Sequence, residues 1–359
     1  VDSWDGLLRR RRLESVTGLR AAWLTASAAL VAVGACGGDT TAFDSVGGGG
    51  AGEGGDPMMG GMGGAPTTAT GTGGEGGMAP PPFVLEVATQ LDMTGVLSLL
   101  TNLPADIGDC LALDVVGLPC EDLDEDGLND PWETIVLDRF RPFLRLDEAE
   151  KLVDDPGFVT GIVGRVTPRG GDVLVYMMLG YEHDFGSCGG FSGHNGDSER
   201  VVLELRRVDG SVGDAALQRA YTAAHEGTLS DHGMIFEAGS LASLVFDADP
   251  MVGGEPRWVV FPSANKHATY ANVSICEGIS PLPCFDEDCA PDDVPDPTPF
   301  TRLVPFVNAG EPDHHLIDEL TPIGFPGEDA WLDQSFCGGL GGIGCASSVV
   351  SKLVNDPFP

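Results

Sequence analysis

Titratable side chains gather between Glu182 and Glu199, where the chain holds two of its seven histidines and four carboxylates. The apolar residues that follow alternate as the inward face of a strand does: Val201, Leu203 and Leu205. Asp197 and Glu199 share their parity, so both carboxylates are expected to face inward at the end of that strand. A buried carboxylate needs a cation or a hydrogen-bond donor. With His194 just upstream on Gly193, the stretch predicts a metal or catalytic site at the mouth of a β-structure. A polar turn that caps the strand is the alternative.

The stretch Asp122–Glu133 (DLDEDGLNDPWE) carries oxygen ligands at the spacing of an EF-hand calcium loop. The expected ligands are Asp122, Asp124, Asp126, the backbone carbonyl of Leu128, Asp130 and Glu133. Gly127 takes the sixth position, where the turn needs a residue free of Cβ strain. Hard oxygen ligands suit Ca²⁺ better than Zn²⁺ or Mg²⁺. Asp130 is also expected to cap the helix that follows. An acidic turn without metal is the alternative.

The calcium loop resembles the lone D-x-D-x-D-G loops of thrombospondin type 3 and dockerin modules. Leu118-Pro119-Cys120 precedes it and makes a poor end for an entering helix. A structural ion is therefore expected here, and a paired calcium sensor is not.

Three further histidines lie at the ends of expected strands: His225, His232 and His267. They could converge with the Asp197 and Glu199 carboxylates at one end of the β-structure, which we call the rim. Imidazole with carboxylate suits zinc, iron or manganese, whereas carboxylates with water suit calcium or magnesium. A second divalent cation, Ca²⁺, Mg²⁺ or Zn²⁺, is therefore a possible cofactor of the rim.

The first 35 residues have the features of an export signal. Arg9–Arg12 and Arg20 are followed by the short apolar stretch 21–35. Val33-Gly34-Ala35-Cys36 resembles the bacterial lipobox, which implies cleavage before Cys36, lipidation of its thiol, and a place at the outer membrane or cell surface. A plain signal peptide is the alternative.

Residues 36–82 are glycine-rich and predict a flexible tether. The net charge is −36, and without residues 1–35 the chain keeps 14 basic and 52 acidic side chains, a net of −38. That balance argues against nucleic acid or anionic lipid as a partner.

Nine cysteines, less Cys36, leave eight, which in an exported protein predicts disulfides. Local spacing favours Cys110–Cys120 and Cys337–Cys345. No tight Cys-x-x-Cys pair suggests a zinc cluster.

The apolar positions from Leu85 to Leu103 predict one or two amphipathic helices, and Glu133–Val153 is expected to run as helix and turn. From Phe158 the pattern turns to short strands punctuated by Gly, Asp and Pro. They are expected over Phe158–Thr167, Asp172–Glu182, Arg200–Val208, Ala216–Ala224, Gly233–Ala238, Leu244–Phe246, Arg257–Phe261 and Thr301–Val307.

The expected fold is mainly β: an antiparallel β-sandwich with N-terminal helices and an EF-hand-like calcium loop. Residues 83–157 form the helical segment with this loop, and 158–359 form the sandwich with disulfide-pinned loops and tail.

Short motifs resemble two known families. Gly193–Glu199 (GHNGDSE) resembles the G-H-x-x-D-W-E motif of the necrosis- and ethylene-inducing-like cytolysins. It is also similar to the G-D-W-E segment of a vacuolar-sorting-type family. Ala224-His225 and His267–Tyr270 look like that second family's S-x-H and H-A-S-Y elements, in the same order.

The resemblance implies a β-sandwich whose motif holds a divalent cation, largely through water. It gives cation-facing roles to His194, Asp197 and Glu199, with Asp184 as a further candidate, and His267 joins them at the rim. Ser198 stands where the cytolysins have tryptophan.

Three functions are consistent with these features. The first is a lipid-anchored surface protein whose rim binds a glycan or a lipid headgroup. The second is a metal-dependent hydrolase, with His194 or His267 as general base. The third is a structural envelope lipoprotein. The chain lacks H-E-x-x-H, G-x-S-x-G, P-loop and dinucleotide motifs.

Overall fold

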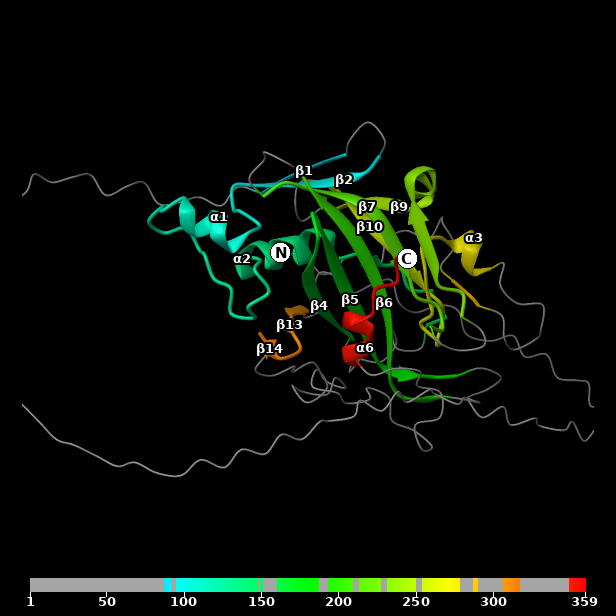
Figure 1. Ribbon diagram of the computed structural model, residues 1–359. Coiled ribbons are helices and arrows are strands. Elements are labelled where there is room, and N and C mark those ends of the chain that lie inside the picture. The colour runs from blue at the N-terminus through cyan, green and yellow to red at the C-terminus, as the bar shows by residue number, and fades with distance from the viewer. Residues whose placement is uncertain are drawn as a thin grey trace, which may run out of the picture. The chain divides into compact units, whose positions relative to one another are not determined.

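A large, mostly antiparallel sheet dominates the computed structural model (Figure 1). Its strand order is β1-β2-β7-β6-β5-β4-β12, with β8 paired to β7. The bounds are β1 Val87–Leu91, β2 Leu97–Thr101, β4 Thr160–Arg169, β5 Asp172–Asp184, β6 His194–Arg207, β7 Ala215–Thr222, β8 Met234–Glu237 and β12 Phe306–Asn308. The strand β12 runs parallel to β4, whereas the other pairs are antiparallel.

A smaller sheet is centred on β10 (Glu255–Pro262). It pairs with β9 (Val245–Asp249) and β11 (Thr269–Tyr270) in antiparallel fashion and with β3 (Phe143–Leu144) in parallel. A short hairpin joins β13 (Gly310–Glu311) to β14 (His314–His315). The helices are α1 Ile107–Ala112, α2 Asp130–Phe140, α3 Val273–Cys276, α6 Val349–Val354 and the 3₁₀ helix η2 Ala238–Ser243.

The structure describes residues 87–91, 95–147, 149–150, 160–186, 193–208, 213–226, 231–249, 254–277, 287–289, 306–316 and 349–359. All of them belong to one unit, Gly76–Pro359. The predictions for the signal 1–35, Cys36, the tether 36–82 and Cys337–Cys345 lie outside these residues. No helix in the described ranges has the length and apolar character needed to cross a membrane.

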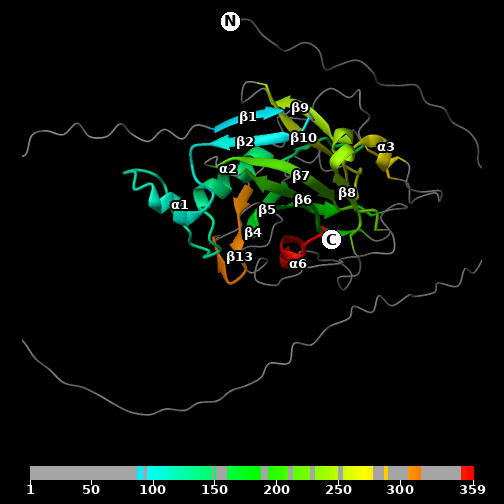
Figure 2. The ribbon, with the colours of Figure 1, turned by 45° about the horizontal axis from the view of Figure 1, so that its top comes forward.

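The central strands bury both of their faces. The odd-numbered apolar residues of β5 and β6 pack with Trp132 and Val136 of α2 and with Trp258 of β10. The even-numbered face packs against Val350 and Leu353 of α6 and against Phe358. The helix α2 packs closely on β4 at Gly164. A Cβ at this position would lie only 2.5 Å from Leu137 Cδ2. The fold is therefore mainly β, with an antiparallel-rich sheet packed against a second layer, as predicted; Figure 2 shows α6 and α2 on different sides of the strands.

The helices expected between Leu85 and Leu103 are a wrong prediction, because this stretch forms the β1–β2 hairpin. Leu97, Leu99 and Thr101 alternate as buried residues, and β2 pairs with β7. The sequence Leu97–Thr101 fits a period of two as well as it fits a helix. The neighbouring strand therefore decides its conformation.

The predicted strands from β4 to β10 are present with shifted ends, and β6 begins at His194 instead of Arg200. The predicted disulfide Cys110–Cys120 is confirmed, with Cα atoms 5.8 Å apart. A second disulfide that the spacing left open joins Cys276 to Cys289.

Candidate functional site

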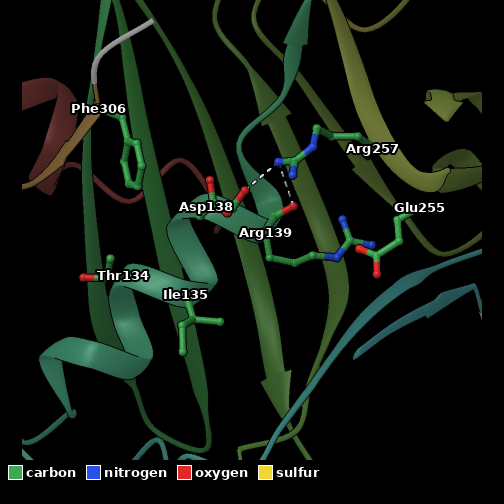
Figure 3. A pocket seen from close by; sticks show the side chains of 7 residues that line it. All are labelled: Thr134, Ile135, Asp138, Arg139, Glu255, Arg257 and Phe306. Atoms are coloured by element: carbon green, nitrogen blue, oxygen red, sulfur yellow. Dashed lines mark hydrogen bonds between the residues drawn. The ribbon is translucent and has the colours of Figure 1, made fainter. Parts of the chain in front are cut away.

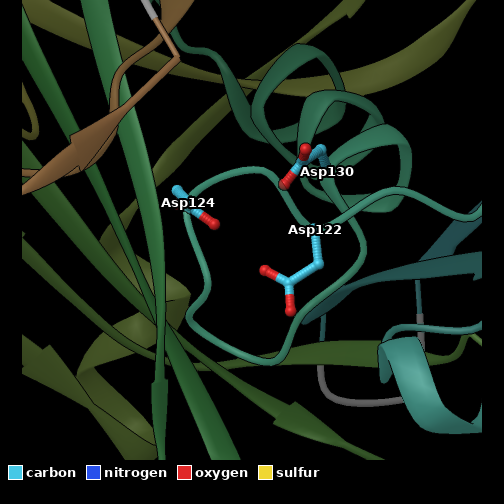
Figure 4. A group of neighbouring side chains, drawn as sticks. All are labelled: Asp122, Asp124 and Asp130. Carbon is cyan, nitrogen blue, oxygen red and sulfur yellow. The ribbon is translucent and has the colours of Figure 1, made fainter. Parts of the chain in front are cut away.

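The acidic side chains of the calcium loop converge. Carboxylate oxygens of Asp122, Asp124 and Asp130 lie within 4.8 Å of one another, and Figure 4 shows these side chains pointing into the loop. Asp124, Asp126 and Glu133 form a second group of the same kind. The structure thus brings the predicted side-chain ligands together. All of them are carboxylates, and they face one another.

Six buried carboxylate oxygens of this loop have no hydrogen-bond partner among the described residues. They are Asp122 Oδ1, both oxygens of Asp124, Asp126 Oδ2, Asp130 Oδ1 and Glu133 Oε1. Such groups cost free energy unless something satisfies them. A hard cation would supply the missing partner to the acids grouped around it, so the donor set fits Ca²⁺.

Burial and neighbouring carboxylates raise the pKa values of Asp124, Asp126, Asp130 and Glu133. The pKa of Asp124 rises to about 6, mainly through burial and then through the charges of Asp130 and Asp122. Burial raises the pKa of Asp126 to about 7 and that of Glu133 to about 10. A divalent cation would reverse this effect, since it favours the ionised carboxylates.

The backbone of the loop is shaped for this convergence. Gly127 has φ 91°, in the left-handed region, and a Cβ added to it would meet no atom within 4 Å outside its chain neighbours. The amide of Leu128 donates to Asp126 Oδ1 at 2.8 Å, and the amide of Leu123 donates to Asp130 Oδ2 at 2.9 Å. Asp130 was expected to cap α2, but it is the first residue of the helix and its carboxylate faces the loop. The N-cap position belongs to Asn129, whose side chain makes no capping hydrogen bond.

The segment Phe306–Leu316 closes over the loop. Asn308 Nδ2 donates to Glu133 Oε2 at 2.9 Å. A Cβ on Gly310 would lie 3.0 Å from Asp124 Cβ, so only glycine allows this approach. Glu311 pairs with Arg165 of β4. Sequence reasoning missed Asn308 and Gly310, because they lie in a stretch without periodicity, far along the chain from the loop.

At the rim, His267 is fully buried between two carboxylates. Its Nδ1 lies 3.0 Å from Asp197 Oδ2, and its Nε2 lies 3.3 Å from Glu150 Oε2. The ring of Tyr181 stacks on it, with centroids 4.0 Å apart. Burial alone would lower the pKa of His267, but hydrogen bonds and charge from Asp197 and Glu150 raise it to about 9. The ring is therefore an imidazolium at neutral pH.

Glu199 has different partners. Its Oε1 accepts a hydrogen bond from the amide of His225 at 3.2 Å, and its Oε2 lies 3.8 Å from Nζ of Lys352 in α6. Burial raises the pKa of Glu199 to about 6, although Lys352 acts against this. His225 itself pairs with Glu287 at 2.9 Å.

The structure thus brings Asp197, Glu199 and His267 to one end of the sheet, and both acids lie on the buried face that their parity predicts. Asp184 accepts a hydrogen bond from the amide of Gly186. His194 opens β6 opposite Asp184, and its side chain lies outside the described residues. Among the described residues, two groups of acidic side chains are close enough to share an ion, and both lie in the calcium loop.

Sequence reasoning missed Glu150, Lys352 and Glu287. Each is buried, yet Glu150 and Glu287 lie in polar stretches that give no sign of burial, and Lys352 is a lone charge in the short apolar helix α6. Strained backbone marks the same end of the sheet: His225, Asn265 and His267 have φ values of 55°, 65° and 61°. Non-glycine residues adopt this conformation at a cost of roughly 1–3 kcal/mol, which the surrounding contacts must offset.

No family model matches the chain, and no curated protein matches it. Two solved structures resemble parts of it at 14% sequence identity each. The first, titled "Toxin fold for microbial attack and plant defense", has a TM-score of 0.27 over 49% of this chain and 74% of its own. The second, titled "NLPPya in complex with glucosamine", has a TM-score of 0.23 over 42% of this chain and 83% of its own. Both TM-scores are low, so the function is inferred from the chain's own residues.

Proposed function

We propose that this chain is an exported, lipid-anchored bacterial surface protein that binds Ca²⁺ at Asp122–Glu133 as a structural ion. The observation that carries the proposal is the set of six buried carboxylate oxygens without partners in this loop. The export signal and the lipid anchor at Cys36 would place the chain outside the cytoplasm, where calcium is usually plentiful.

The ion's role is to hold three segments together. Asp122, Asp124 and Asp126 belong to the loop, Glu133 belongs to α2, and Asn308 ties Glu133 to β12. Because Asp124 and Glu133 are 1% and 0% exposed, a bound ion would be enclosed and would not meet a partner directly. This favours a structural ion over a regulatory one.

Thermal unfolding of the lipid-free Cys36→Ser chain tests the proposal. Ca²⁺ at about 100 times its dissociation constant should stabilise the fold by about 2.7 kcal/mol over the chelated protein. Mg²⁺ should do less, since it accepts a crowded, all-protein oxygen site less readily. Equal melting temperatures in Ca²⁺ and in chelator would contradict the proposal.

For the partner, one exposed feature favours lipid over glycan. The disulfide-closed loop 110–120 presents apolar side chains to solvent: Leu111 is 63% exposed, Leu113 47%, Val115 47% and Val116 78%. Such a patch is typical of an interaction site, and a tethered protein meets a bilayer first. The net charge of −36 favours uncharged or zwitterionic lipid over anionic lipid.

Co-sedimentation of the Cys36→Ser chain with phosphatidylcholine vesicles tests this preference. Val116→Asp should reduce the bound fraction, whereas Val208→Asp, at a 41% exposed position outside the loop, should not. Equal binding by both variants would show that the loop is not the contact.

The hydrolase alternative is less well supported by the rim. A general base must accept a proton at a free lone pair. With its pKa raised to about 9 between Asp197 and Glu150, the ring of His267 favours the imidazolium, in which both nitrogens are protonated. The second proton also opposes its use as a metal ligand. His194, Asp184, Asp197 and Glu199 stay as the proposed ligands of a rim cation.

A further inference from the structure

A pocket of about 470 Å³ lies where α2, β10 and β12 meet (Figure 3). It is lined by Thr134, Ile135, Asp138, Arg139, Glu255, Arg257 and Phe306. The volume is in the range of small-molecule sites. Its wall combines apolar side chains with two guanidinium groups and two carboxylates.

The two arginines differ in how well they are satisfied. Arg257 donates from Nε to Asp249 Oδ2 at 2.9 Å and from Nη1 to the carbonyl of Arg141 at 3.2 Å. Arg139 is only 4% exposed, yet its Nε and Nη2 have no hydrogen-bond partner in the part of the chain that the structure describes. Its guanidinium lies 5.6 Å from the ring of Phe140, a contact that does not satisfy the N–H groups.

A buried guanidinium whose N–H groups lack acceptors is costly, even though the charges of Glu255, Asp138 and Asp249 favour its charged form. Burial and the charge of Arg257 lower the pKa of Arg139 to about 10, so it still carries its charge at neutral pH. An anion that enters the pocket would supply the missing acceptors. Guanidinium pairs especially well with carboxylate, through two parallel hydrogen bonds.

The other lining residues narrow the choice of anion. Ile135 and Phe306 offer apolar contact, which suits a ligand with an apolar body. Glu255 and Asp138 line the same pocket and would repel a multiply charged anion such as phosphate. We propose that this pocket binds a small monocarboxylate with an apolar body, whose carboxylate pairs with Arg139.

The test uses the full Cys36→Ser chain and benzoate as the probe, followed by ligand-observed NMR and calorimetry. Benzoate should bind saturably, while benzyl alcohol, which has the same ring without the charge, should bind at least tenfold more weakly. Inorganic phosphate should not displace benzoate. Absent benzoate binding, equal binding of benzyl alcohol, or displacement by phosphate would each overturn the proposal.

Variants locate the site. Arg139→Met should weaken benzoate binding at least tenfold, and Arg206→Met, at an arginine whose side chain is 61% exposed on β6, should leave it unchanged. Without benzoate, Arg139→Met should melt no lower than the parent, because it removes a buried guanidinium whose Nε and Nη2 lack acceptors among the described residues. Unchanged binding in Arg139→Met, or lost binding in Arg206→Met, would contradict the assignment.

A second variant serves if Arg139→Met fails to fold. Glu255→Gln removes a competing negative charge and keeps the shape of the side chain. It should bind benzoate several-fold more tightly than the parent. Unchanged or weaker binding would overturn the proposal independently of Arg139.

Discussion

Asn308 of β12 donates a hydrogen bond from Nδ2 to Oε2 of Glu133, the last acid of the calcium loop, at 2.9 Å. The two residues are 175 positions apart in the sequence. The contact leaves Glu133 Oε1 without a partner and facing the other acids. It therefore orients the carboxylate and connects the loop to the edge of the large sheet, where β12 pairs with β4.

Replacing Asn308 tests this connection. Asn308→Ala removes one donor to a fully buried carboxylate and should cost about 1–3 kcal/mol of unfolding free energy. It should also weaken Ca²⁺ binding, since Glu133 loses its orientation. Chemical denaturation and calcium titration would measure both. The exposed Asn102→Ala serves as control, and a loss equal to the control's would contradict the role assigned to Asn308.

Gly127 provides a test of the loop's backbone. Its φ of 91° is strained for any residue with a Cβ, but no atom within 4 Å would clash with one. Gly127→Ala should therefore cost about 1–2 kcal/mol through conformation alone. Gly171→Ala has equally open surroundings and no positive φ, so its cost should be smaller. Equal melting temperatures for the two variants would contradict the assignment.

His267 predicts a pH dependence. Its pKa is about 9 in the folded chain against an ordinary value of 6.5, so the folded state holds the proton more tightly than the unfolded chain does. The stabilisation is fully present below pH 6.5 and is lost as the pH rises through about 9. It amounts to about 3 kcal/mol. NMR titration of the ring, with the exposed His232 as reference, checks the value; a pKa at or below 6.5 would contradict the imidazolium.

Much of the fold could be predicted from the sequence where apolar residues alternate along a strand. The parity of Asp197 and Glu199 with Leu203 indicated the correct buried face. The hairpin before Thr101 could not be predicted, because its conformation depends on pairing with β7, which lies more than 100 residues further along.

The calcium loop and the rim differ for the same reason in how well the sequence predicts them. The calcium loop is local in sequence, so spacing alone identified the acids that the structure brings together. The rim depends on residues from distant segments. The sequence predicted a metal ion beside His267 and Glu199. In the structure, Glu150 lies beside His267 and Lys352 lies beside Glu199.

Direct calcium titration of two matched variants is the most decisive measurement. Glu133→Gln removes the charge of the twelfth ligand, whereas Glu125→Gln makes the same change at an exposed position of the same loop. The parent and Glu125→Gln should bind one Ca²⁺ with similar affinity, and Glu133→Gln should bind at least tenfold more weakly. Equal affinities for the two variants, or no calcium binding by the parent, would contradict a calcium site at Asp122–Glu133.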